Sequence, residues 1–203
     1  MINILPLTSL NDGTCEEMHF FLSGDYDYDK IGDKRAKNMI IRLGNTLARK
    51  IKKTDLPSLP ADPDPMADWS ARLFSADRVQ YILISNTASL YSLVIGGKGV
   101  TNENTLLHEM TDSMREVMEK DGFRSIYEKR VAPHTTRFRF GKALNRSVTG
   151  SMNEFVFQAK CHLVEDGLSP SDVSFRLNET LMSYLKYRNP RQAFKLMSQE
   201  SSG

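Results

Sequence analysis

The stretch WSARLFSADRVQYILISNTASLYSLVI, residues 69–95, decides the fold of this chain. Three short segments within it are rich in β-branched, aromatic and other apolar residues: 69–74, 79–84 and 89–95. The polar links between them are short enough for hairpins, which favours antiparallel pairing of consecutive strands. The middle segment is apolar on nearly both of its faces and is therefore expected at the centre of the sheet.

A further strand and a proline-rich connector are predicted upstream of this stretch. Residues 39–43 read as a strand, Gly44 and Asn45 as a turn or cap, and residues 46–53 as a short basic helix. Residues 56–66 contain four prolines, which is typical of an extended polyproline-like segment that crosses the surface.

A long helix and one more strand are predicted downstream. Residues 101–120 place their apolar side chains on one helical stripe: Leu106, Leu107, Met110, Met114, Val117 and Met118. In residues 135–140 the alternation sends Phe138 and Phe140 to one face and Arg137 and Arg139 to the other. This pattern predicts a half-buried strand with a cationic face.

The last third of the chain is predicted to be helical. Residues 151–164 carry an apolar stripe of helical period. The pairs Ser169-Pro170 and Asn189-Pro190 each combine a capping side chain with a proline at the first helical position. Residues 198–203 are expected to fray.

These patterns together predict a single α+β domain over residues 38–197. Its expected architecture is an antiparallel sheet meander with helices packed mainly on one face and a helical C-terminal third. Residues 1–37 are expected to form a partly irregular N-terminal extension, in which residues 18–22 could pair as a strand. Residues 198–203 are expected to be a disordered tail.

The composition is that of a globular protein with one core. The chain has 203 residues, of which 40% are hydrophobic and 26% charged, and its net charge is +2. No run approaches the roughly 18 uninterrupted apolar residues of a membrane-spanning helix, and the first residues lack the basic region of a secretory signal. Cys15 and Cys161 are expected to be free thiols. We therefore expect a cytoplasmic protein with no membrane partner.

Charge is distributed unevenly along the chain. Residues 34–53 contain eight basic residues and no acidic one, and residues 124–146 contain seven basic residues and a single acid, Glu128. Each block is either a basic binding face or the solvated face of ordinary helices and strands.

Metal-binding and catalytic motifs are incomplete. Asp25, Asp27 and Asp29 match the first ligands of a calcium loop, but Lys30 replaces its glycine and Ala36 its closing glutamate. The histidines are not spaced as metal ligands: His19, His108, His134 and His162. We predict no metal and no cofactor, and we favour a protein without catalytic activity.

Residues 145–153, NRSVTGSMN, form the strongest candidate site. They gather hydroxyl, amide and guanidinium groups where a helix is predicted to begin, next to the cationic strand. One interpretation is a phosphate or carboxylate site formed by these residues: Arg137, Arg139, Lys142, Asn145, Arg146, Ser147, Thr149, Ser151 and Asn153. The other is that Ser147 or Ser151 caps the helix, Gly150 makes a tight turn and the asparagines bond to backbone groups. An anion bound here should also contact an arginine of the cationic strand.

The chain resembles a family of small, uncharacterised bacterial proteins defined only as a domain of unknown function. The resemblance rests on these passages: 69–95, 145–153, 177–182 and 187–190. The second passage keeps the pattern Asn-Arg-Ser-x-x-Gly-Ser-Met-Asn, whereas in the later motifs Leu181 replaces a proline and Asn189 a serine. The resemblance covers most of residues 38–197 and implies no activity, cofactor or catalytic residue.

For function, we predict a binding or regulatory module that recognises a phosphate-bearing partner, RNA or DNA ahead of a nucleotide, through the cationic strand and the helix start. One alternative is a protein-interaction subunit of a bacterial defence or toxin-neutralising system. It would dock through residues 1–37, where Tyr26 and Tyr28 alternate with acids, and through the proline-rich connector. A further alternative is an enzyme acting on a phosphorylated substrate, with His108, His134 or His162 as its base.

Overall fold

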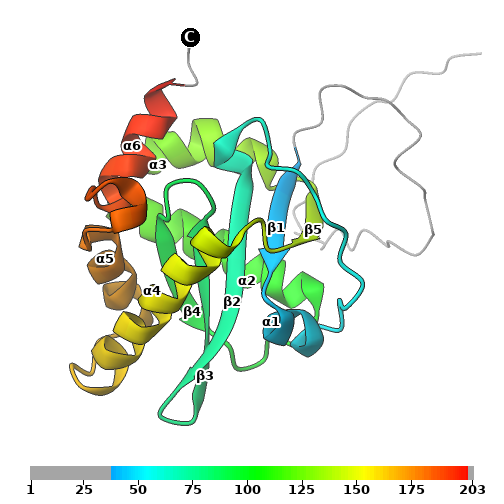
Figure 1. Ribbon diagram of the computed structural model, residues 1–203, viewed down its shortest axis with the longest axis vertical. Coiled ribbons are helices and arrows are strands. Elements are labelled where there is room, and N and C mark those ends of the chain that lie inside the picture. The colour runs from blue at the N-terminus through cyan, green and yellow to red at the C-terminus, as the bar shows by residue number, and fades with distance from the viewer. Residues whose placement is uncertain (1–37, 201–203) are drawn as a thin grey trace, which may run out of the picture. The chain divides into compact units, whose positions relative to one another are not determined.

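The computed structural model of the chain describes residues 38–200 (Figure 1). The strands are β1 (Met39–Leu43), β2 (Asp68–Ala76), β3 (Val79–Asn86), β4 (Ser92–Gly96) and β5 (Phe138–Lys142). The helices are α1 (Asn45–Lys50), α2 (Glu103–Lys120), α3 (Arg124–Ile126), α4 (Arg146–Val164), α5 (Pro170–Glu179) and α6 (Pro190–Glu200). Predictions for residues 1–37, among them the strand at 18–22, the incomplete calcium loop and the docking tyrosines, lie outside the described residues.

The five strands form one mixed sheet in the order β4-β3-β2-β1-β5. β2, β3 and β4 are antiparallel neighbours, as the hairpin-length links predict. β1 is parallel to both β2 and β5, so the prediction of a purely antiparallel sheet is wrong. Short polar links predict pairing only between strands that follow one another directly. β1 reaches β2 and β5 through long connections, which parallel pairing requires.

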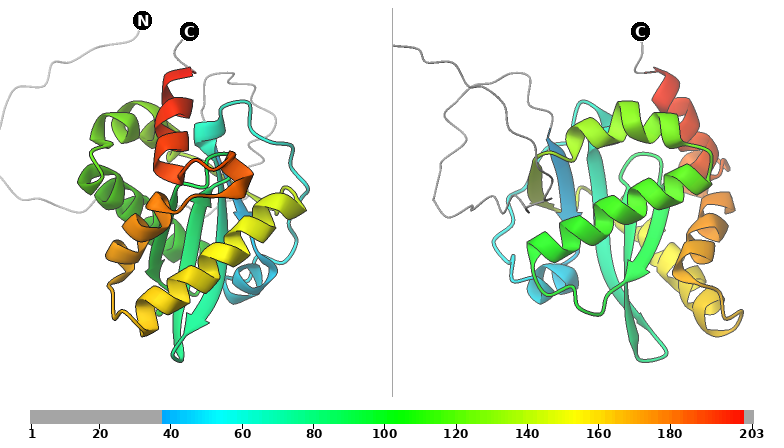
Figure 2. Two further views of the ribbon diagram at one scale, coloured as in Figure 1. Left: turned by 60° about the vertical axis from the view of Figure 1, so that its left-hand side comes forward. Right: turned by 180° about the vertical axis from the view of Figure 1, so that it is seen from behind.

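Helices cover both faces of the sheet, not mainly one as predicted. On the face that we call the α2 face, Ile82 and Ile84 of β3 share a core with residues of α1, α2 and α6. On the opposite face, the α4 face, Leu83 shares a second core with residues of α4 and α5. Figure 1 shows α4 in front of the sheet with α5 beside the β4 edge, and the right-hand view of Figure 2, taken from behind, shows α2 crossing the opposite face. A central strand that is apolar on both sides needs cover on both.

The helix that contains the NRSVTGSMN passage begins five residues before the predicted start. Asn145 is its cap, and the side-chain oxygen of Asn145 accepts a hydrogen bond from the Val148 N–H at 2.9 Å. Gly150 consequently lies inside α4, and its prediction as a tight turn is wrong. The prediction that Ser147 or Ser151 is the cap is also wrong, because the asparagine upstream takes that position. At the other end of the chain, α6 continues to Glu200, past the predicted start of the tail.

A buried ion pair ties the proline-rich connector to the sheet. Arg42 of β1 is only 1% exposed and forms a bidentate pair with Asp68 of β2, with distances of 2.7 Å from Nε and 2.6 Å from Nη2. Its remaining donors reach the carbonyl oxygens of Leu59, Pro60 and Lys142. The connector therefore does more than cross the surface as predicted, because its backbone completes the environment of a buried charge.

The outer edge of β4 is closed by side chains of α5. The Asn178 amide accepts from the Ser92 N–H at 2.7 Å and donates to the Ser92 carbonyl at 2.9 Å, as a neighbouring strand would. One turn earlier, the Ser174 hydroxyl accepts from the Val94 N–H at 2.8 Å. These bonds satisfy backbone groups that an open sheet edge would leave available for pairing with another chain.

A candidate anion-binding crevice

A crevice lies where β1 and β5 end. The two strands are parallel neighbours, so their carboxyl ends meet at the same edge of the sheet. After β1 the chain enters α1 on the α2 face, and after β5 it enters α4 on the opposite face. Neighbouring parallel strands whose connections leave toward opposite faces define a topological switch point, which is where ligands bind in open sheets of this kind.

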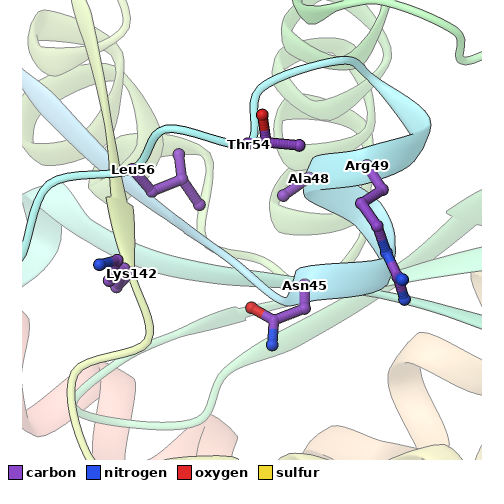
Figure 3. A pocket seen from close by; sticks show the side chains of 6 residues that line it. All are labelled: Asn45, Ala48, Arg49, Thr54, Leu56 and Lys142. Carbon is purple, nitrogen blue, oxygen red and sulfur yellow. The ribbon is translucent and has the colours of Figure 1, made fainter.

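Four adjoining hollows make up this crevice. The first lies between α1 and the end of β5, and Figure 3 shows Asn45 and Arg49 on its α1 side and Lys142 on its β5 side. Asn45 and Arg49 also line the next hollow, which reaches Arg72 of β2. Thr149 of α4 lines that hollow and the remaining two. The crevice thus runs from α1 past β2 to the first turns of α4.

Cations from four different elements surround the crevice without counter-charges. They are Arg49 of α1, Arg72 of β2, Lys142 of β5 and Arg146 of α4. A fifth cation, Arg42 of β1, also lines one hollow, but it is paired with Asp68. No carboxylate lines any of the four hollows within the described residues. Over residues 38–200, no hydrogen bond or ion pair joins these four side-chain heads to another residue. Some exposed cations elsewhere are paired, as Lys120 is with Glu116 at 2.6 Å.

The structure brings together about half of the residues predicted for the site. Lys142, Asn145, Arg146, Thr149 and Asn153 all line the crevice. Three further lining residues, Asn45, Arg49 and Arg72, are absent from the predicted site. The basic block at 34–53 contains Arg49, but no pattern in the sequence places α1 beside α4.

Four predicted residues lie outside the crevice. Arg137 lines a separate hollow beside Phe138, together with the acids Asp55 and Glu103. Arg139 lines none of the four hollows, and its alternation with the phenylalanines puts it on the α4 face. Ser147 is exposed in the first turn of α4, whereas Ser151 is only 9% exposed on the core side of that helix. Ser151 lines none of the four hollows.

The polar networks outside the crevice serve the fold. The Tyr91 hydroxyl donates to Asp121 at 3.0 Å, and Arg191 pairs with the same carboxylate at 2.7 Å. Burial raises the pKa of Asp121 above its ordinary value of 3.8, and the Tyr91 hydrogen bond and the Arg191 charge oppose this rise. Burial likewise raises the pKa of Tyr91, and the charge of Asp121 adds to the rise.

None of the histidines named as possible bases lines the crevice. His134 is buried, with Nε2 3.2 Å from Asp64 and with no hydrogen-bond partner for Nδ1 within residues 38–200. His108 and His162 each lie on a helix surface beside an aspartate one turn later. No group of three or more His, Cys, Asp or Glu side chains in the described part of the chain could hold a metal ion.

The fold and the crevice define an α+β domain with a mixed five-stranded sheet and a cationic switch-point crevice. The chain belongs to the family described as Domain of unknown function (DUF6933), which matches residues 40–193. The predicted kinship with an uncharacterised domain family is therefore confirmed, and the match spans every cation of the crevice. No curated protein and no solved structure matches the chain. Among the described helices, none has the length and apolarity to span a membrane.

Proposed function

We propose that this protein binds a phosphate-bearing ligand in the crevice, single-stranded RNA or DNA ahead of a free nucleotide. The observation that carries the proposal is the group of four unpaired cations, Arg49, Arg72, Lys142 and Arg146, around one crevice that no carboxylate of the described residues lines. Like charges held around one space repel one another, and a bound anion removes that repulsion.

The types of side chain support an oxyanion such as phosphate over a simple halide. Three of the four cations are arginines, whose planar guanidinium groups present paired donors that match phosphate oxygens. Asn45, Asn145 and Thr149 add neutral polar groups along the same crevice. Mixed contacts of this kind, from cations, amides and hydroxyls, are typical of protein contacts to a nucleic-acid backbone.

The shape of the crevice favours a chain of phosphates over a single nucleotide. The cations are spread over adjoining hollows that are open to solvent, from α1 at one end to α4 at the other. A small ligand is usually enclosed in one cavity that buries most of its surface. An open groove that follows a sugar-phosphate backbone is instead typical of proteins that bind single strands.

Fluorescence anisotropy with labelled oligothymidine and oligouridine tests the proposal. The double variant Lys142→Gln/Arg146→Gln is expected to bind roughly tenfold more weakly or worse, because each charged contact to phosphate contributes on the order of 1.5 kcal/mol. The matched control is Arg176→Gln/Lys195→Gln, which removes one arginine and one lysine from helix positions outside the crevice.

The control variant should bind like the unaltered protein. Equal affinities of all three proteins for both oligomers, or no binding by the unaltered protein, would contradict the proposal. Tighter binding of adenosine triphosphate than of either oligomer would move the assignment from a nucleic acid to a nucleotide.

A further inference from the structure

Gly150 occupies a position where the fold itself has no need for glycine. It lies within the 19-residue helix α4, and glycine destabilises the interior of a helix relative to alanine. Over residues 38–200, a Cβ atom added at Gly150 would meet no atom beyond its own stretch of helix within 4 Å. By contrast, a Cβ on Gly141 would approach Leu59 to 3.1 Å, and a Cβ on Gly97 would approach the Gln80 backbone to 3.0 Å. Packing therefore explains Gly97 and Gly141 but not Gly150.

The open space beside Gly150 is the α4 end of the crevice. This hollow of about 490 Å³ lies between the β5–α4 link and the first turns of α4. Ala143 and Leu144 supply the apolar part of its lining, and Gly150 adds backbone without a side chain. Arg146 and Asn153 also line it, and their side-chain heads have no partner over residues 38–200. The hollow thus combines apolar surface with two hydrogen-bonding groups that are available to a ligand.

We propose that this hollow is a nucleobase subsite, in which Gly150 lets a planar ring lie directly against α4. The inference rests on the proposed function and names the part of the ligand that this end of the crevice receives. The phosphates lie on the cations, and the attached base lies against Gly150.

The chemistry of the lining favours a base over a further phosphate. A phosphate needs donors and gains nothing from apolar surface, whereas a base presents a large apolar face and a polar edge. The Asn153 amide has both a donor and an acceptor, so it can pair with the edge of a base. The Arg146 guanidinium can bond to the same ring or to the phosphate next to it. A side chain at position 150 would occupy the space that the ring needs.

The test uses two labelled single strands with the same number of phosphates, oligothymidine and an abasic deoxyribose-phosphate oligomer. Gly150→Ala and Gly150→Leu are compared with Ser147→Leu, which adds bulk to the same helix at an exposed position outside the hollow. Gly150→Leu is expected to weaken oligothymidine binding roughly fivefold or more, because the leucine side chain would occupy the space of the base, and Gly150→Ala less. Binding of the abasic oligomer should change by less than about twofold in every variant, because its phosphate contacts remain.

A thermal denaturation readout separates a ligand effect from damage to the fold. Gly150→Ala should raise the melting temperature by roughly 2–4 °C, because alanine favours a helix interior and the added Cβ meets no neighbour. We expect Gly150→Ala to be more stable than the unaltered protein and to bind oligothymidine more weakly. This combination would show that the ligand, and not the fold, requires the glycine. Unchanged oligothymidine binding by Gly150→Leu, or an equal loss for both oligomers, would overturn the subsite.

The outcomes also distinguish this inference from the proposed function. If the unaltered protein binds the two oligomers equally, the phosphate site stands and the base subsite is overturned. If the unaltered protein binds neither oligomer, the proposed function fails, and the subsite fails with it.

Discussion

The arginine of β1 and the cations of the crevice lie close together in the fold but differ in what their donors do. Arg42 makes five side-chain hydrogen bonds: two to Asp68 and three to the carbonyl oxygens of Leu59, Pro60 and Lys142. Arg49, Arg72 and Arg146 form no such bond over residues 38–200. All donors of Arg42 are therefore bonded within the protein, whereas the donors of the three crevice arginines remain available to a ligand.

This difference separates two roles that a basic residue can have. A buried cation with all of its donors bonded holds segments together, and the protein depends on it for stability. An exposed cation without a partner contributes little to stability, and several of them around one crevice repel one another. Substitutions at the two places should therefore affect different measurements, stability in the first case and ligand binding in the second.

The largest effect is expected at the buried pair. Asp68→Asn removes the negative charge that neutralises Arg42, and it leaves a guanidinium buried without a counter-charge. The free energy of unfolding should fall by about 3–5 kcal/mol, the usual result of breaking a buried pair by removing one partner. Urea denaturation followed by circular dichroism measures this loss. A loss below about 1 kcal/mol would show that the pair is not essential to the fold.

Substitutions in the crevice should have the opposite profile. Arg49→Gln/Arg72→Gln is expected to weaken oligothymidine binding roughly tenfold or more, with a change in unfolding free energy within about 0.5 kcal/mol. Arg124→Gln is the control, because Arg124 is paired with Glu119 and Glu128 outside the crevice. If the double variant unfolds as easily as Asp68→Asn, the two groups of cations do not differ as described.

A buried but uncharged group extends the comparison. Asn178 is 1% exposed and bonds in both directions to the Ser92 backbone at the edge of β4. Asn178→Ala should lower the unfolding free energy by about 1–3 kcal/mol, because it leaves buried backbone groups without partners. Urea denaturation measures this loss, and sedimentation velocity would detect pairing through the uncovered edge. Glu154→Ala, an exposed substitution on α4, serves as the control and should change neither measurement.

The smallest effect concerns the pH dependence of stability. Burial raises the folded-state pKa of Asp121 above its ordinary value of 3.8, so the folded protein holds this proton more tightly than the unfolded chain does. The contribution of Asp121 is therefore most favourable below pH 3.8 and is lost as the pH rises through the folded-state pKa. The unfolding free energy of Asp121→Asn minus that of the unaltered protein should increase as the pH rises from 3.8 through the folded-state pKa of Asp121. A decrease over this range would mean that the folded-state pKa is lowered.

Local signals in the sequence predict much of the fold. The short links at 75–78 and 85–88 predict the hairpins of β2, β3 and β4, and proline next to a capping residue predicts the starts of α5 and α6. These signals act between neighbours in the sequence. The parallel pairing of β1 with β2 and β5 depends on long connections, and no local pattern determines it.

The crevice could be predicted only in part for the same reason. The passage from Lys142 to Asn153 is continuous and rich in polar groups, so it is visible as a candidate. Arg49 and Arg72 join it only because the switch point brings α1 and β2 beside α4. Glycine usually indicates a turn, and for this reason the sequence predicts one at Gly150. The prediction is wrong because α4 begins directly after the Asn145 cap and therefore contains Gly150.

The central claim is that the unpaired crevice cations bind phosphate groups, and the salt dependence of binding tests it most directly. For the unaltered protein, the logarithm of the oligothymidine association constant should fall linearly with the logarithm of the salt concentration. In the variant with Arg49, Arg72, Lys142 and Arg146 all replaced by Gln, the slope should become shallower by about 0.7 for each phosphate that is no longer neutralised. An unchanged slope in a variant that unfolds at the same urea concentration as the unaltered protein would contradict the account.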